Sequence, residues 1–203
     1  MKQGFVKVAS ATPRIRVADP VYNAQVICEQ AKEAAEHGAK IVVFPELCIT
    51  GYTCNDLFLQ ELLLEKAKEA LLTIAEETGQ LETLFLVGLP VDKDGRLYNV
   101  AAVLYRGRIL GMIPKKNIPM YAEFYEGRHF TPGEETVTEY RLGKQVIPFG
   151  SNLLFRCEEL PELVLGCELC EDLWVAEPPS TSHALMGATV IANLSLSLIH
   201  ISE

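Results

Sequence analysis

The feature that most constrains the fold is the short run KIVVFPE at residues 40–46. Three β-branched residues and a phenylalanine follow one another, and a proline then ends the run. A strand that is apolar on both faces must be covered on both faces, which is typical of a buried parallel strand. Helical patterns precede and follow this run, so the sequence predicts an α/β layered protein.

The two flanking helices are indicated by apolar periodicity and by their terminal residues. Asp19 and Pro20 supply an N-cap and a proline at the first helical position. Apolar residues then recur at three- and four-residue spacing until Gly38 ends the pattern. A second amphipathic pattern begins near Leu63 and ends at Gly79. The segment GFVKVASATP at residues 4–13 alternates like a strand, so the first half of the chain reads strand, helix, strand, helix.

The second half is predicted to be mostly strands. A long loop with a helical turn is expected at 116–135, and a helix followed by a strand within 179–195. The predicted strands are 83–91, 98–105, 109–115, 145–157 and 162–170. No internal repeat, domain boundary or glycine-rich nucleotide loop interrupts this order.

Composition excludes several classes of protein. The 203 residues are 49% apolar and 22% charged, which is typical of a globular domain. The net charge is −9 and no basic cluster occurs, which argues against nucleic acid as a partner. No apolar stretch approaches the roughly 20 residues of a membrane span, and the first residues lack a secretory signal pattern. Six scattered cysteines indicate reduced thiols, and we expect a cytoplasmic location.

Three potentially reactive residues follow three predicted strands. Glu46, Lys115 and Cys170 each stand at a strand's carboxyl end, where α/β sheets place their chemistry. A carboxylate can take the proton of a thiol, and an ammonium can stabilise the thiolate and then an oxyanion. Together these groups could cleave an amide without a histidine. Each residue alone is more readily a loop acid, a solvated lysine or a buried thiol, so residue types by themselves support the catalytic interpretation only weakly.

The pair Cys167 and Cys170 has other interpretations, because a CxxC can be half of a zinc site or a redox pair. No second CxxC or histidine pair occurs at suitable spacing, which argues against zinc. Side chains alternate along an extended strand, so we expect the two thiols to face opposite sides. By this reasoning Cys167 faces the core and Cys170 the site.

Three motifs carry a resemblance to a known family. The stretches VVFPELCITGY, PKKNIPMYAEFYEGRHFTPG and CEDLW resemble, in order and spacing, the nitrilase superfamily of carbon–nitrogen hydrolases. The family's Glu–Lys–Cys triad falls on Glu46, Lys115 and Cys170, with Lys115 preferred to Lys116 because it directly follows Pro114. The resemblance implies a four-layer αββα sandwich. It is strongest to the glutaminase domains of bacterial glutamine-dependent NAD⁺ synthetases.

That branch implies further residues and partners. Glu126 matches a second glutamate near the triad, Tyr121 and Phe124 match residues lining a glutamine pocket, and Glu171 matches an acid that binds the α-ammonium. For Tyr121 and Phe124, ordinary loop packing remains an alternative. The implied substrate is L-glutamine, cleaved through an acyl-thioester without metal or cofactor. The ammonia would serve a synthetase domain that uses ATP and Mg²⁺, and a homo-oligomer is implied.

The match to the family is expected to end before the chain does. We assign residues 1–195 to an incomplete carbon–nitrogen hydrolase domain and 196–203 to a tail outside the family pattern, extraneous to the protein. This tail includes Ser197, at the position of a substrate-contacting serine. The C-terminal part of the hydrolase domain and the synthetase domain are expected to be missing, which would leave apolar faces uncovered. The alternatives are a stand-alone amidase or carbamoylase, and an inactive fragment.

Overall fold

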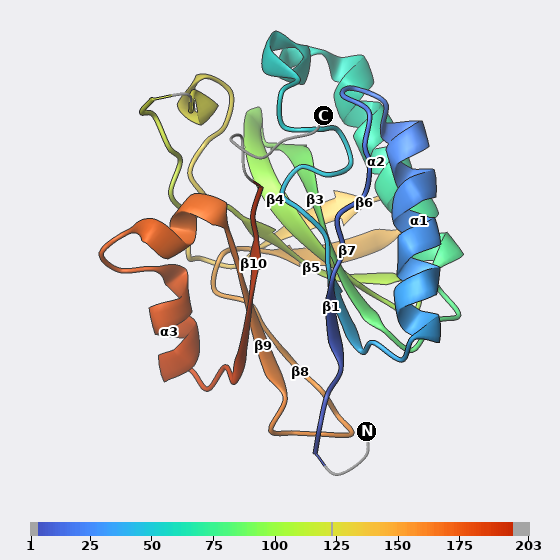
Figure 1. Cartoon of the computed structure of the whole chain (residues 1–203). Coiled ribbons are helices and arrows are strands. Elements are labelled where there is room, and N and C mark those ends of the chain that lie inside the picture. Colours follow the sequence, from blue (N-terminus) through green and yellow to red (C-terminus); the bar gives the residue numbers. More distant parts are fainter. Residues whose placement is uncertain (1–3, 123, 197–203) are drawn as a thin grey trace.

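Two β-sheets stacked face to face form the centre of the molecule, and helices cover their outer faces (Figure 1). The computed structural model describes residues 4–122 and 124–196. The helices α1 (Pro20–Glu36) and α2 (Glu61–Glu77) pack together on the larger sheet, and α3 (Pro179–Leu185) packs on the smaller one. The layers follow the order α, β, β, α, which confirms the predicted four-layer sandwich.

The larger sheet is mixed and the smaller sheet has three strands. In spatial order, the larger sheet consists of β1 (Val8–Ser10), β2 (Ile41–Val43), β3 (Leu84–Lys93), β4 (Arg96–Tyr105), β5 (Arg108–Pro114), β7 (Gln145–Phe149) and β6 (Thr138–Leu142). The smaller sheet has the order β10 (Val190–Leu194), β9 (Val164–Leu169) and β8 (Leu154–Arg156). Because β2 and β3 are parallel while β4 runs opposite to β3 and β5, the strands β2 and β5 end at the same edge.

The first helix begins and ends where its terminal residues predict. The Asp19 side chain accepts a hydrogen bond from the backbone N–H of Tyr22 at 3.1 Å, and Pro20 occupies the first turn, where its missing N–H costs nothing. Gly38, with φ of +82°, ends the helix in the left-handed region. The buried face of α1 then packs beside α2 into the core over the larger sheet.

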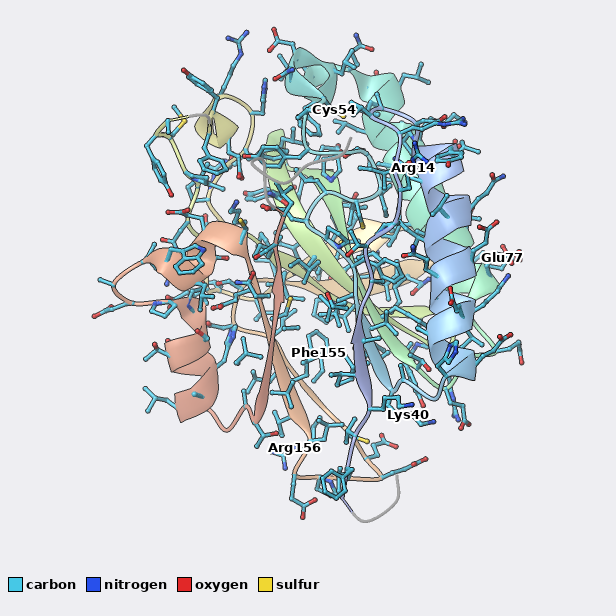
Figure 2. The ribbon with its side chains drawn as sticks, viewed as in Figure 1. Arg14, Lys40, Cys54, Glu77, Phe155 and Arg156 are labelled. Atoms are coloured by element: carbon cyan, nitrogen blue, oxygen red, sulfur yellow. The ribbon has the colours of Figure 1, made fainter. Side chains whose placement is uncertain are left out.

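A second apolar core lies between the two sheets. Strand β9 packs across β4 and β5, while β10 packs across β2 and β3. Gly111 of β5 leaves space for the ring of Phe155, which β8 contributes to this layer (Figure 2). A Cβ atom at position 111 would lie 2.9 Å from that ring. The close approach of the sheets therefore requires glycine at this position.

The structure differs from the sequence-based prediction in the region of β6, β7 and β8. Residues 145–157 were predicted as one strand, but they form β7 and β8, which belong to different sheets. Strand β6 was not predicted at all. It pairs with β7 across a turn at Gly143, and only Tyr140 and Leu142 of it are buried. An edge strand with charged residues on its outer face carries a weak apolar signal, which explains the omission.

Two connections near the sheet edge contain short 3₁₀ turns. The first is η1 (Asn55–Leu59), between β2 and α2, and the second is η2 (Glu126–Arg128). The second lies in the long connection after β5, so the expected helical turn is confirmed. A third turn, η3 (Cys170–Trp174), follows β9 directly. No helix among the residues that the structure describes is long and apolar enough to cross a bilayer.

Apolar side chains are uncovered on the outer surface near η3 and α3. Trp174 is 74% exposed and Leu185 is 85% exposed, and Leu173 and Met186 are also exposed. Exposed apolar residues also occur elsewhere, at Phe5 and Leu62 for example, so the expectation that missing segments leave apolar faces uncovered stays a prediction.

Candidate active site

Glu46 follows β2 in a tight turn that lies against β3. The turn needs the absence of a side chain at Gly88, because a Cβ atom there would lie 2.3 Å from the backbone nitrogen of Leu47. Leu47 itself has φ of +52°, a conformation that is uncommon for a residue with a branched side chain. The turn directs Glu46 inward, where it is only 2% exposed. Local backbone packing therefore fixes this carboxylate in the interior.

Lys115 stands at the end of β5 and is completely buried. Its Nζ atom lies 2.7 Å from Oε1 of Glu46 and 2.7 Å from Oε1 of Glu126. The neighbouring Lys116 instead reaches the surface, where it pairs with Glu135. Of the two lysines, only Lys115 reaches the buried carboxylates. A buried ammonium is tolerated here because two carboxylates surround it.

Two further residues complete the cluster, and the sequence analysis missed both. Asn99 of β4 donates from Nδ2 to Glu46 at 2.6 Å and to Glu126 at 3.3 Å. The hydroxyl of Tyr52 donates to Oε1 of Glu126 at 2.9 Å. Asn99 is the one polar residue among the buried, apolar positions of β4, and this contrast was the available signal. No comparable pattern distinguishes Tyr52.

Cys170 is placed by a sharp change of backbone direction. Strand β9 ends at Leu169, and Cys170 begins η3 with φ of +41°. The strand alternation used to separate the two thiols therefore does not extend to residue 170. The two thiols nevertheless lie in different places, as expected, but for a different reason. Cys167 is fully buried between the sheets, while the turn leads Cys170 out of the strand. The described cysteines are all free thiols.

The electrostatics of the cluster leave Glu46 close to its ionisation point at neutral pH. Burial raises the pKa of Glu46, the Lys115 ammonium lowers it, and the Glu126 carboxylate raises it again, to about 7. Burial alone would lower the pKa of Lys115, but the two carboxylates outweigh burial and raise it above its ordinary value. Lys115 is therefore protonated at neutral pH.

The thiol of Cys170 is influenced by the same charges. Burial and then the Glu46 carboxylate raise the pKa of Cys170 to about 11, while Lys115 opposes them. At neutral pH this thiol is protonated and needs a base before it can act as a nucleophile. Oε2 of Glu46 has no hydrogen-bond partner among the residues that the structure describes. It is therefore an available acceptor for the thiol proton.

Aromatic and acidic side chains gather beside the cluster. The hydroxyl of Tyr121 donates to Oε2 of Glu171 at 2.7 Å. The rings of Tyr121 and Phe124 are 5.6 Å apart, and those of Phe124 and Tyr52 are 6.5 Å apart. The predicted residues Tyr121, Phe124 and Glu171 are thus linked, and Tyr52 connects them to Glu126. This arrangement combines apolar surface with one carboxylate that is only partly buried.

No metal centre is evident in the described part of the chain, where no group of three or more histidine, cysteine or acidic residues is arranged around a common point. Burial of Cys167 also argues against the zinc interpretation of Cys167 and Cys170. Cys167 is fully enclosed by the apolar layer between the sheets, where burial holds the pKa of its thiol far above the ordinary range. Zinc is bound by thiolates, which that environment disfavours.

The αββα sandwich thus carries a buried carboxylate–lysine pair near the Cys170 thiol. The chain belongs to the carbon–nitrogen hydrolase family, whose model matches residues 7–202.

Named relatives agree with this assignment. The chain is 42% identical over 202 residues to a glutamine-dependent NAD⁺ synthetase of Mycobacterium tuberculosis, covering 100% of this chain and 30% of that protein. A crystal structure of a glutamine-dependent NAD⁺ synthetase from Cytophaga hutchinsonii has a TM-score of 0.83 at 29% identity, covering 95% of this chain and 30% of that one. The chain thus spans about 30% of the length of these relatives.

A more distant likeness concerns the fold alone. An amidase from Nesterenkonia sp. AN1 has a TM-score of 0.73 at 20% identity, covering 94% of this chain and 64% of that one. The expected tail at 196–203, including Ser197, lies outside the described residues from position 197 onward, so the boundary at residue 195 stays a prediction.

Proposed function

We propose that this chain is a glutaminase domain, which hydrolyses the side-chain amide of L-glutamine and supplies ammonia to a synthetase domain. The observation that carries the proposal is the burial of Glu46 and Lys115 as an ion pair beside the Cys170 thiol. A buried ion pair is weak evidence for stability, because hydrophobic replacements are often as stable. A reactive partner next to the pair gives it a chemical use.

In the first half-reaction, Sγ of Cys170 attacks the carbonyl carbon of the glutamine amide while Glu46 accepts the thiol proton. The carbonyl oxygen becomes an oxyanion, and the Lys115 ammonium stabilises the negative charge. Collapse of the tetrahedral intermediate breaks the carbon–nitrogen bond. Glu46 returns its proton to the leaving nitrogen, which departs as ammonia. The products at this stage are ammonia and a γ-glutamyl thioester on Cys170.

In the second half-reaction, a water molecule replaces the ammonia. Glu46, ionised again, accepts a proton from the water as its oxygen attacks the thioester carbon. The carbon–sulfur bond breaks, the proton passes to the sulfur, and glutamate leaves. The pKa of Glu46, held near 7 by its burial and its neighbours, suits a group that must both take and return a proton at neutral pH. The two half-reactions need no metal or cofactor.

In this scheme Glu126 and Asn99 orient residues of the triad and do not bind the substrate. Each contacts Glu46 or Lys115 directly, so they hold the base and the ammonium in a fixed orientation. Glu126 also supplies the second negative charge that keeps Lys115 protonated. Preorganised charges of this kind lower the barrier because nothing has to rearrange during the reaction.

The assignment of glutamine rests on Glu171 and on the named relatives. A partly buried carboxylate beside the thiol can pair with the α-ammonium group, while Tyr121 and Phe124 cover the aliphatic part of the substrate. The relatives are about three times longer than this chain, so we assign residues 1–195 to the hydrolase domain of such a synthetase. The partner synthetase domain would consume the ammonia with ATP and Mg²⁺, and we expect a homo-oligomer.

The test is an ammonia assay across a panel of amides. We expect release from glutamine, with little from asparagine or N-carbamoyl amino acids. Glu171→Gln should raise KM for glutamine about 10- to 100-fold, because a charged hydrogen bond is worth about 1.5–3 kcal/mol. Tyr121→Phe, which removes only the hydroxyl bound to Glu171, is the matched control and should have a smaller effect. Preferential release from a carbamoyl amino acid or from an amide without an α-ammonium group would favour a stand-alone carbamoylase or amidase instead.

A further inference from the structure

Asp172 is a buried acid that the proposed reaction does not use. It lies in η3, two residues after Cys170, and is only 1% exposed. No lysine, arginine or histidine in the described part of the chain lies within ion-pair distance of it. Burial raises its pKa, while hydrogen bonds from four donor groups of neighbouring residues lower it. A buried carboxylate without a cation is unusual and needs a structural reason.

The hydrogen bonds of Asp172 come from two different segments. Oδ2 accepts from the backbone N–H of Leu169 at 3.1 Å, which is the residue directly before Cys170. Oδ1 accepts from the backbone N–H of Asn117 at 2.7 Å, from its Nδ2 at 2.9 Å, and from the N–H of Lys116 at 3.2 Å. Lys116 and Asn117 directly follow Lys115. One carboxylate thus joins the nucleophile's turn to the chain that carries the ammonium.

This connection matters because the two segments belong to different sheets. Cys170 follows β9 of the smaller sheet, whereas Lys115 ends β5 of the larger one. The backbone of Cys170 is also held at φ of +41°, which a residue with a side chain adopts only under external constraint. The Lys115 cluster is fixed by its own bonds to Glu46 and Glu126, but these bonds do not hold the thiol.

We propose that Asp172 is a positioning residue, which fixes the Cys170 thiol against the Glu46–Lys115 pair by clamping the two segments together. The inference rests on the proposed function only in taking Cys170 as the nucleophile. Asp172 touches neither substrate nor reacting atoms in this role. It acts through the backbone N–H groups of Leu169, Lys116 and Asn117.

Asp172→Asn is the direct perturbation, because it keeps the size of the side chain. The amide has one acceptor oxygen and one NH₂ group, so one of the two segments would meet a donor where it needs an acceptor. Glu168→Gln is the matched control. Glu168 is also 1% exposed and precedes Leu169 on β9, but its oxygens accept from Ser180 and Asn193, not from the Lys115 segment. A glutamine there still offers an oxygen to one of them.

The assay is alkylation of Cys170 by iodoacetamide from pH 6 to 10, followed by peptide mapping to separate this thiol from the other five cysteines. The groups that act on the thiol's charge are Glu46, Lys115 and the backbone of Leu196, which hydrogen-bonds to the sulfur, and the phenol of Tyr52 also lies within its field. In the unaltered chain the rate should rise as Glu46 ionises, near pH 7. A thiol separated from this base must ionise unaided while burial still raises its pKa, so its rate should rise only well above about pH 8.5.

We expect Asp172→Asn to slow alkylation at pH 7.5 by about 10- to 100-fold, up to the lower end of the range of general-base effects, and to move the profile to higher pH. Glu168→Gln should keep the original profile even if it melts earlier. A folded Asp172→Asn variant with the original rate and profile would overturn the proposal. If that variant does not fold, Asn117→Ala decides: a slowing of about threefold or more supports the clamp, and an unchanged rate refutes it.

This assay does not depend on glutamine. Rapid, pH-dependent alkylation of Cys170 without ammonia release from glutamine would refute the proposed substrate and leave the clamp standing. Normal glutamine hydrolysis with alkylation unaffected by the Asp172→Asn change would support the proposed substrate and refute the clamp.

Discussion

Replacing Glu126 by glutamine should move the pH dependence of the reaction to lower pH. The substitution is nearly isosteric, and the amide oxygen can keep the two shorter hydrogen bonds, from Lys115 at 2.7 Å and from Tyr52 at 2.9 Å. The hydrogen bond that the amide cannot accept is the longest of the three, from Asn99 at 3.3 Å. Glu126→Gln therefore removes a negative charge from the cluster and little else.

The magnitude follows from the shared ammonium. Because Nζ of Lys115 lies 2.7 Å from an oxygen of each carboxylate, the two oxygens are separated by at most twice that distance. At about 5 Å and an effective dielectric constant of about 20, the repulsion between the two charges is about 3 kcal/mol, or about 2 pKa units. Rearrangement and screening within the cluster reduce the effect of this repulsion, and we expect the pKa of Glu46 to fall by about 1 unit.

The sign of the effect follows from the proposed role of Glu46 as a base. With a pKa of about 7, Glu46 is mostly protonated at pH 6, and the reaction is slow. In the variant about half of it would be ionised at that pH, so activity relative to the plateau should rise about fivefold. The plateau itself should fall, because a base of lower pKa accepts the thiol proton less readily. The acid side of the profile thus shifts while the maximum declines.

The measurement is kcat/KM for ammonia release from glutamine between pH 5 and 9, since this ratio reports ionisations of the free enzyme. Glu135→Gln is the matched control, because Glu135 is an exposed glutamate that pairs with Lys116 outside the cluster. Its removal should leave the profile in place. An acid limb that stays at the same pH in Glu126→Gln, or moves upward, would show that Glu126 does not raise the pKa of the base.

Five further substitutions test the placement of the site. Cys170→Ala should abolish ammonia release, while Cys167→Ala should retain it and instead lower the urea midpoint, because it opens a cavity between the sheets. Lys115→Ala should cost about 3–5 kcal/mol in free energy of unfolding by leaving buried carboxylates unpaired, whereas Lys116→Ala, at a surface ion pair, should stay within about 0.5 kcal/mol. Gly88→Ala should destabilise the chain by about 1–3 kcal/mol and reduce ammonia release, because its Cβ would collide with the turn that carries Glu46. Normal activity in this variant would show that the turn does not depend on the close contact at Gly88.

Much of the fold could be predicted because its signals are local. The cap at Asp19, the apolar periodicity of α1 and the β-branched run of β2 each lie within a few neighbouring residues. Strand β6 was missed because its burial alternates and its outer residues are charged, so its identity depends on pairing with β7. The division of residues 145–157 between two sheets likewise depends on contacts far along the chain.

The site was predictable only in part, for the same reason. Glu46, Lys115 and Cys170 stand at strand ends, which the sequence indicates, and the resemblance to a family selected them from equally plausible alternatives. Asn99 and Tyr52 lie in unrelated segments, and only the three-dimensional structure brings them to the same carboxylates. The direction of the residue 170 side chain could not follow from strand periodicity, because the chain turns at that residue.

The left-handed backbone at residue 170 is unfavourable for folding when the residue is a cysteine, but the proposed chemistry requires a cysteine there. A residue without a side chain adopts this conformation freely, so a chain selected for folding alone would carry glycine there. Cys170→Gly should accordingly raise the melting temperature while eliminating the proposed nucleophile. The backbone conformation at residue 170 therefore lowers the free energy of unfolding. Favourable interactions elsewhere in the molecule have to compensate for this loss.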